Sequence, residues 1–144
     1  MMGLPRQSPN WLAKTFKFME WQEAPQIKDT LREILMVLDL PYINVDKISC
    51  YRTEGSTSRS YARIWSFPKI FQKALNIEPH YVIEVLSKYY DRLDSDEQKK
   101  VLIHELLHIP KNFSGALLPH KTRSRHLGKT ANALFKEYKK KVTC

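Results

Sequence analysis

The sequence has little cysteine and no long apolar run, and each shortage argues against a class of protein. Its 144 residues include two cysteines, Cys50 and Cys144. So few thiols favour a reducing compartment over a secreted, disulfide-bonded fold. No run of about 18 apolar residues occurs, so we expect no transmembrane helix and no membrane partner. The start of the chain also lacks the apolar core of a signal peptide, which completes the prediction of a cytoplasmic protein.

What the sequence has in excess is positive charge. Lysine and arginine total 24 against 15 acidic residues, a formal net charge of +9. Basic residues cluster over 121–129 and again over 136–141. Charge of this size indicates either solubility or a weak, salt-dependent contact with DNA, and both interpretations stay open. No separate DNA-binding motif such as a zinc finger accompanies it.

Hydrophobic periodicity predicts one α+β domain. The expected elements are a helix over 25–39, strands over 45–53, 61–67 and 81–86, a loop over 87–94, a helix over 96–109 and a closing helix from about residue 124. This order predicts a compact domain over 25–144, in which a small antiparallel or mixed sheet of about three strands packs on the 96–109 helix. The short connections favour antiparallel pairing. Residues 1–24 form a lead-in segment, and whether it covers a cleft stays open.

The strongest chemical signal is the run His104-Glu105-Leu106-Leu107-His108. Two histidines four residues apart lie on one face of a helix, so both imidazoles can reach one Zn²⁺ ion. In such H-E-x-x-H sites the glutamate, here Glu105, is the base that takes a proton from a zinc-activated water. The alternative is an ordinary amphipathic helix with two surface histidines. Apolar flanks argue against it, because a buried helix with these polar groups needs a partner such as a metal.

With Phe113-Ser114-Gly115 and Pro119-His120 downstream, the His104–Pro110 run resembles the small metallopeptidases of archaea and phages. This group is zincin-like and similar in plan to SprT-like proteases. The resemblance extends over about residues 25–140, including 61–65 and 81–85. It implies a zincin-like core, one bound zinc and peptide hydrolysis, and it implies no particular substrate.

Two histidines, His120 and His126, compete for the place of third zinc ligand. The resemblance favours His120, since it matches the family's Pro-His and lies outside the basic run that follows. His126 corresponds better to the third ligand of SprT-like proteins. Glu137 is a weaker candidate on the closing helix, and His80 is interpreted as a strand-end or surface histidine.

Three functions follow from this pattern. The first is a zinc peptidase in which an extended peptide or protein substrate pairs with an exposed strand, 61–67 or 81–86. The second is a SprT-like protease that acts on DNA-bound proteins. The third is a non-catalytic, zinc-stabilised interaction domain. Candidates for a second oxyanion donor are Tyr89, Tyr90, Arg123 and Tyr138.

Overall fold

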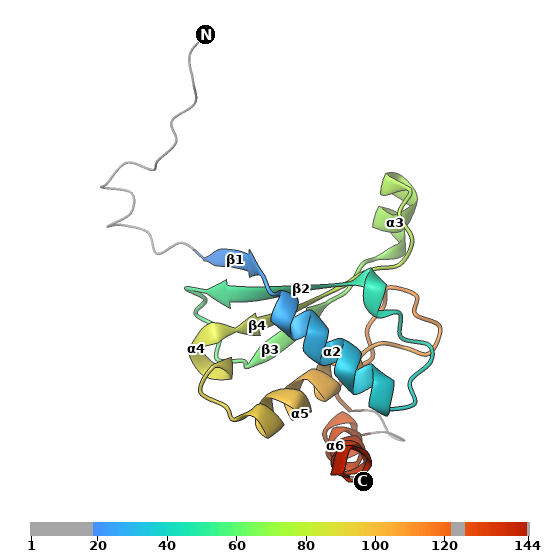
Figure 1. Ribbon diagram of the computed structural model, residues 1–144. Helices are drawn as coiled ribbons and strands as arrows, with labels where there is room; N and C mark the ends of the chain where they lie inside the picture. Colours follow the sequence, from blue (N-terminus) through green and yellow to red (C-terminus); the bar gives the residue numbers. More distant parts are fainter. Residues whose placement is uncertain (1–18, 122–125, 144) are drawn as a thin grey trace, which may run out of the picture.

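The computed structural model describes residues 19–121 and 126–143, in which one face of a four-stranded sheet is covered by helices (Figure 1). The elements in chain order are β1 (Glu20–Glu23), α2 (Pro25–Val37), the 3₁₀ turn η1 (Val45–Lys47), β2 (Ile48–Glu54), β3 (Ala62–Trp65), α3 (Lys69–Leu75), β4 (Tyr81–Leu86), α4 (Ser87–Tyr90), α5 (Ser95–Leu106) and α6 (Leu127–Thr143). The α+β class is therefore confirmed.

The sheet is mixed, with strand order β1-β2-β4-β3. Strands β1 and β3 pair antiparallel with their neighbours, whereas β2 and β4 are parallel. The expectation of antiparallel pairing is wrong for this central pair. Parallel neighbours need a long crossover, and residues 55–80 provide one that includes both β3 and α3. Strand β3 is therefore an edge strand of the sheet, and β4 is a central strand.

Strand β1 and helix α4 were missed by the sequence analysis. Strand β1 lies within the predicted lead-in segment, and all four of its residues are exposed, so no hydrophobic alternation announces it. Helix α4 occupies the first part of the predicted 87–94 loop and has only one turn. Both are held by their neighbours in the fold: β1 pairs along β2, and α4 continues directly from β4.

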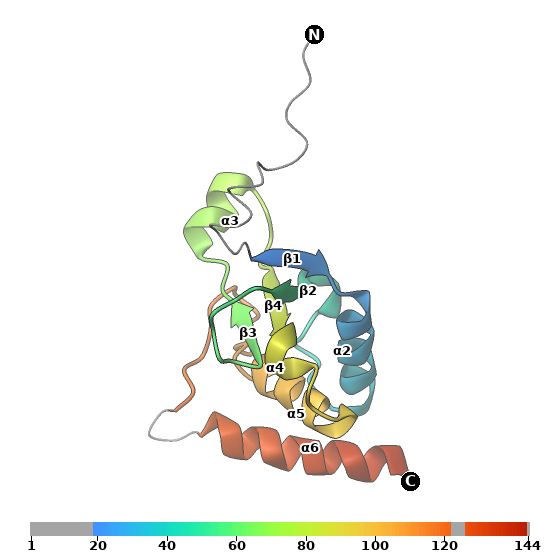
Figure 2. The same ribbon diagram turned by 90° about the vertical axis from the view of Figure 1, so that its left-hand side faces the viewer.

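The core lies between the sheet and three helices. Helices α2 and α5 pack below the sheet, and α6 runs beneath α5 (Figures 1 and 2). Fully buried side chains from these layers include Leu31, Ile34, Ile48, Ile83, Leu102, Ile103, Leu106, Leu127 and Tyr138. In contrast, α3 rises away from the body and has no buried residue (Figure 2). Within the described ranges, none of the helices has the length and apolar content needed to span a bilayer.

The face of the sheet away from these helices is built around one carboxylate. Glu84 in β4 is 1% exposed and accepts hydrogen bonds from Thr53, Arg63 and the indole N–H groups of Trp21 and Trp65. Burial raises the pKa of this carboxyl, but the hydrogen bonds and the positive charge of Arg63 outweigh burial. The pKa of Glu84 therefore lies below its ordinary value.

This lowered pKa predicts an acid-sensitive contribution to stability. The contribution is fully present above the unfolded-state pKa of about 4.3 and is lost as the pH falls through the lower folded-state pKa. We expect the free energy of unfolding to fall more between pH 6 and pH 3 in the wild type than in Glu84→Gln, by roughly 1–3 kcal/mol. Urea unfolding at both pH values measures this difference, and equal falls would contradict the assignment.

Candidate metal centre

Helix α5 carries the first histidine and the glutamate of the H-E-x-x-H run. Its N-terminus is capped by Asp94, whose side chain accepts a hydrogen bond of 2.8 Å from the Glu97 backbone N–H. The helix ends at Leu106, earlier than predicted, so His108 lies in the turn that follows. The His108 backbone N–H still donates to the Glu105 carbonyl at 3.1 Å, which preserves the one-turn relation of the two histidines.

The segment after α5 folds back toward the helix through a turn at Gly115. This glycine has a φ of +94°, and a Cβ atom here would lie 2.3 Å from the Phe67 carbonyl oxygen. Its N–H donates to the Tyr81 hydroxyl at 2.8 Å, and that hydroxyl donates to the Ala116 carbonyl at 2.8 Å. The Gln72 side-chain amide donates hydrogen bonds to the carbonyls of Phe67 and Ser114, which links the two segments. Glycine is required here by both its backbone conformation and the close approach.

His108 holds the returning segment and is itself oriented by it. The Leu118 N–H donates to the His108 carbonyl at 2.7 Å, and the His108 ring nitrogen Nδ1 lies 2.6 Å from the Leu118 carbonyl. A carbonyl only accepts, so Nδ1 carries the proton in this contact. The other ring nitrogen, Nε2, is then the unprotonated one that can bind a metal ion, which is the usual arrangement of a metal-binding histidine.

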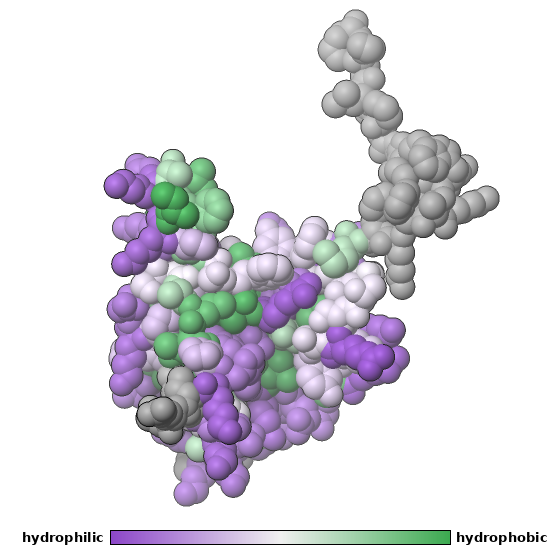
Figure 3. Space-filling model, turned by 180° about the vertical axis from the view of Figure 1, so that it is seen from behind, coloured by the Kyte–Doolittle hydropathy of each residue, from purple (hydrophilic) through white to green (hydrophobic). Residues whose placement is uncertain are grey.

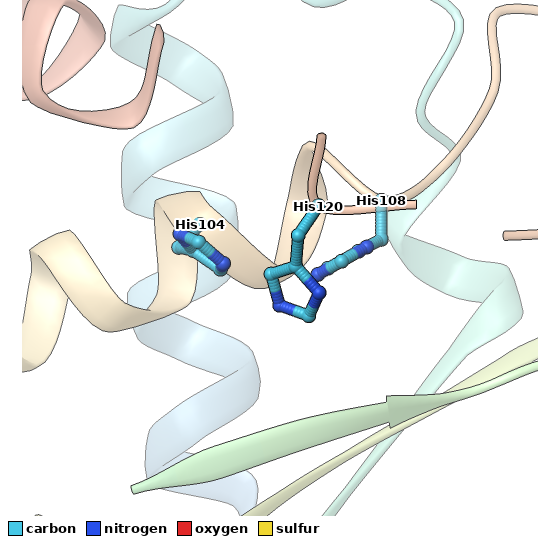
Figure 4. Close-up of side chains that lie close together, drawn as sticks. All are labelled: His104, His108 and His120. Atoms are coloured by element: carbon cyan, nitrogen blue, oxygen red, sulfur yellow. The ribbon is translucent and has the colours of Figure 1, made fainter. Parts of the chain in front are cut away.

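These connections bring His104, His108 and His120 together (Figure 4). One ligand nitrogen from each lies within 4.8 Å of the other two. The ring centroids are 4.4–5.4 Å apart. Nitrogen ligands of tetrahedral zinc lie roughly 3.3 Å apart, given Zn–N bonds of about 2.05 Å. Small side-chain rotations close that difference, so the donor set fits one metal ion bound by three imidazoles.

The charges around the cluster also suit a metal. Burial and the neighbouring imidazoles of His108 and His120 hold the pKa of His104 below its ordinary value. His104 is therefore neutral at pH 7, which is the form that binds metal. Glu105 is 9% exposed, and burial raises the pKa of its carboxyl to about 8. A bound cation would oppose this rise by favouring the carboxylate.

A cleft passes over the three histidines. Two hollows of about 420 and 440 Å³ meet at Ser60, Ala62, Glu105 and His120, which line both of them. One continues between α5 and α6 to Ala131 and Asn132, and the other continues along β3 to Leu117 and Pro119. Together they form an open channel with the histidines and Glu105 on its floor and the end strand β3 along one wall.

Comparison with known families gives the decisive observation. The sequence model of the family described as "Putative phage metallopeptidase" matches residues 19–138, most of the chain. The chain belongs to this phage metallopeptidase family. No curated protein and no solved structure matches it. Membership supports peptidase chemistry that depends on a metal, and the three histidines are where this family member can bind the metal.

The other predicted residues of this family member lie outside the cluster. His126 precedes α6, and its ring accepts a hydrogen bond of 3.3 Å from the Lys129 N–H, as a helix cap does. Glu137 forms an ion pair with Lys141 at 2.9 Å. His80 lies 3.2 Å from the Ser49 hydroxyl at the start of β4, consistent with the strand-end histidine expected.

None of the described tyrosines proposed as oxyanion donors lines the cleft. Tyr90 and Tyr138 are 2% and 1% exposed and belong to the core, where burial raises the pKa of Tyr90 to about 12. Tyr89 is half-buried on α4, and Arg123 lies outside the described residues. Besides the three histidines and Glu105, the polar residues that line the cleft are instead Ser60, Tyr61, Arg63, Lys100 and Asn132, which carry no motif and come together only in the folded chain.

The geometry predicts which histidines of the chain control zinc binding. His120→Ala should weaken zinc affinity by more than roughly 100-fold, since even residues behind the ligands change affinity 10–100-fold. His126→Ala, the matched control, should change zinc affinity little, because the His126 ring caps the start of α6. Competition with a chromophoric chelator measures both affinities. A large loss in His126→Ala with none in His120→Ala would reverse the assignment.

Proposed function

We propose that this protein is a zinc-dependent peptidase in which His104, His108 and His120 hold the metal and Glu105 is the general base. The observation that supports it most is the convergence of three imidazoles on the floor of an open cleft. A structural zinc site is closed by four protein ligands, usually with cysteine. The described residues bring only three such side chains together, and His120 is exposed, so a position facing the cleft is left for water and substrate. The set therefore favours catalysis over a non-catalytic zinc domain.

Glu105 is suited to move a proton. When bound, zinc supplies a Lewis acid that polarises the scissile carbonyl and activates a water. Glu105 borders both halves of the cleft and follows the first ligand directly in sequence. Its carboxylate takes the proton of the attacking water and then delivers it to the leaving amine. Burial excludes bulk water from this carboxyl and brings its pKa closer to neutral, where a base and acid work best.

The substrate is proposed to bind as an extended peptide along β3. This strand is an edge strand of the sheet, and its residues Ala62 and Ile64 line the cleft. An end strand offers unpaired backbone N–H and C=O groups to which a peptide can add by β-pairing. Of the two strands considered from the sequence, 61–67 is the one at an edge, because β4 lies between β2 and β3. A peptide paired with β3 passes directly over the histidines.

The test of the base is Glu105→Gln. The amide nearly matches the carboxylate in shape, so the fold and the zinc content should persist. Cleavage should fall by roughly 10²–10⁴-fold, the usual contribution of a general base. Cleavage of β-casein, followed by electrophoresis, and zinc content by elemental analysis measure the two effects.

The matched control is Glu97→Gln, an exposed glutamate in the first turn of the same helix. We expect cleavage at the wild-type rate in this variant. Equal cleavage by the wild type and Glu105→Gln would show that Glu105 is not the base.

A second proposal is that the protease acts on proteins bound to DNA. Its support is the surface of α6, where Lys129, Lys136 and Lys140 are exposed and form no ion pair with any residue the structure describes. Lys139 and Lys141, in contrast, pair with Asp96 and Glu137. Three unneutralised lysines on one helix at the edge of the molecule provide a place for phosphate contacts.

This proposal predicts DNA affinity that falls steeply with salt. Each phosphate contact adds about 0.9 to the slope of log affinity against log salt concentration. Replacing Lys129, Lys136 and Lys140 by glutamine should therefore remove up to about 3 from that slope. The control replaces the paired Lys139 and Lys141 and should have less effect per charge. Fluorescence anisotropy with duplex DNA measures the slopes. No detectable binding at low salt would remove the basis of the proposal.

A further inference from the structure

The face of the sheet opposite the metal centre carries an aromatic pocket. Three aromatic side chains from three different strands, Trp21, Tyr51 and Trp65, surround Val82 in a hollow of about 420 Å³. Trp21 is 55% exposed and Trp65 is 48% exposed. Helices α2, α5 and α6 lie on the other side of the sheet (Figure 1), and none of the residues that line this pocket belongs to a helix. Large aromatic surfaces left open in this way mark binding sites more often than chance exposure does.

The pocket is held in shape by the buried carboxylate of Glu84. The Trp21 indole nitrogen lies 3.1 Å from one of its oxygens, and the Trp65 indole nitrogen lies 2.7 Å from the other. The two oxygens of a carboxylate are about 2.2 Å apart, so the two indole nitrogens lie within about 8 Å of each other. Arg63 neutralises Glu84 and lies over the Trp65 ring at 5.3 Å. Both rings are therefore fixed before any ligand arrives.

The charge beside the pocket is negative, although the whole chain is strongly positive. Glu23 is the register partner of Tyr51 and lies on the same face of β1 as Trp21. Glu20 and Glu54 are also register partners, but they lie on the opposite face of these strands. Glu23 forms no ion pair with a residue in the described ranges.

We propose that this pocket binds an arginine side chain presented by an extended segment of a partner protein. Indole rings attract cations over their faces, and a planar guanidinium also stacks on them, as Arg63 already does on Trp65. Glu23 supplies the unpaired carboxylate that complements the charge. Strand β1 is the other end strand of the sheet, so the segment that carries the arginine can pair with its free edge.

Other occupants fit the pocket less well. Single-stranded nucleic acid also stacks on aromatic side chains, but it requires positive charge along its path. Here the one nearby cation, Arg63, is paired with Glu84, and the neighbouring charge without an ion pair among the described residues is Glu23. The apolar surface of α3, which forms the knob at the upper left of Figure 3, is a separate surface. Its exposed residues Ile70, Phe71 and Leu75 do not line this pocket. A proline-rich segment would use the aromatic rings and would gain nothing from Glu23.

The experiment titrates the full chain with short peptides of the form acetyl-Gly-Ser-Xaa-Ser-Gly-amide and follows the indole N–H signals of Trp21 and Trp65 by NMR. With arginine at Xaa, both signals should shift, and binding should weaken as salt rises. Trp21→Ala, followed through Trp65, should weaken binding about 5- to 30-fold. Glu23→Gln should weaken it about 2- to 5-fold. Trp21→Phe keeps a ring in place and should retain most of the affinity.

The matched control is Phe71→Ala, which removes an aromatic ring of similar exposure, 53%, from α3 and should leave arginine binding unchanged. If peptides with norleucine or proline at Xaa bound equally well, the proposal that the ligand is cationic would be wrong. Indole shifts caused by oligothymidine and by none of the peptides would assign the face to nucleic acid instead. If the arginine peptide bound only after residues 1–18 had been removed, the chain's own N-terminal segment would be the occupant. That result would contradict the proposal that a partner protein supplies the arginine.

Discussion

The arrangement of the site depends on the double hydrogen-bonded contact between His108 and Leu118. Backbone pairing at 2.7 Å fixes where the chain returns to α5, and the ring contact at 2.6 Å fixes which nitrogen of His108 carries the proton. His120 follows two residues later, so its position is a consequence of that pairing. Gly115 permits the turn that makes the return possible, and Tyr81 and Gln72 hold the turn against the sheet and the base of α3. A short segment of irregular chain thus acquires the precision that a metal site requires.

The sheet separates two surfaces of opposite character. On the helix side, burial raises the pKa of the Glu105 carboxyl to about 8, and three imidazoles that could hold a metal ion lie nearby. On the outer side, Glu84 is also buried but accepts hydrogen bonds from four side chains, and its pKa lies below the ordinary value. Glu105 is therefore suited to exchange a proton, whereas Glu84 is an anion with a structural role. Hydrogen-bond partners, and not burial alone, decide between these roles.

The sequence was most informative where a local pattern determines the structure. The H-E-x-x-H run predicted that His104 and His108 lie one helical turn apart on one side, and the structure groups His120 with them. Strand β4 has the predicted bounds because its apolar residues leave little alternative. These features depend on neighbours within a few residues, which is the range over which periodicity carries information.

What the sequence did not predict depends on contacts between distant segments. Strand β1 has the sequence Glu-Trp-Gln-Glu and is a strand because β2 is beside it. The parallel pairing of β2 and β4 is set by the long crossover, and Asn132 reaches the cleft only because α6 packs on α5. The network around Glu84 joins four strands and has no signature in any one of them.

X-ray absorption spectroscopy at the zinc edge tests the central claim most directly, because it counts and identifies the atoms around the metal. For the zinc-loaded wild type we predict three imidazole nitrogens at roughly 2.0–2.1 Å and one oxygen ligand from water. That result would support an open, three-histidine site at the floor of the cleft. A sulfur ligand, or a site closed by four protein ligands, would contradict it.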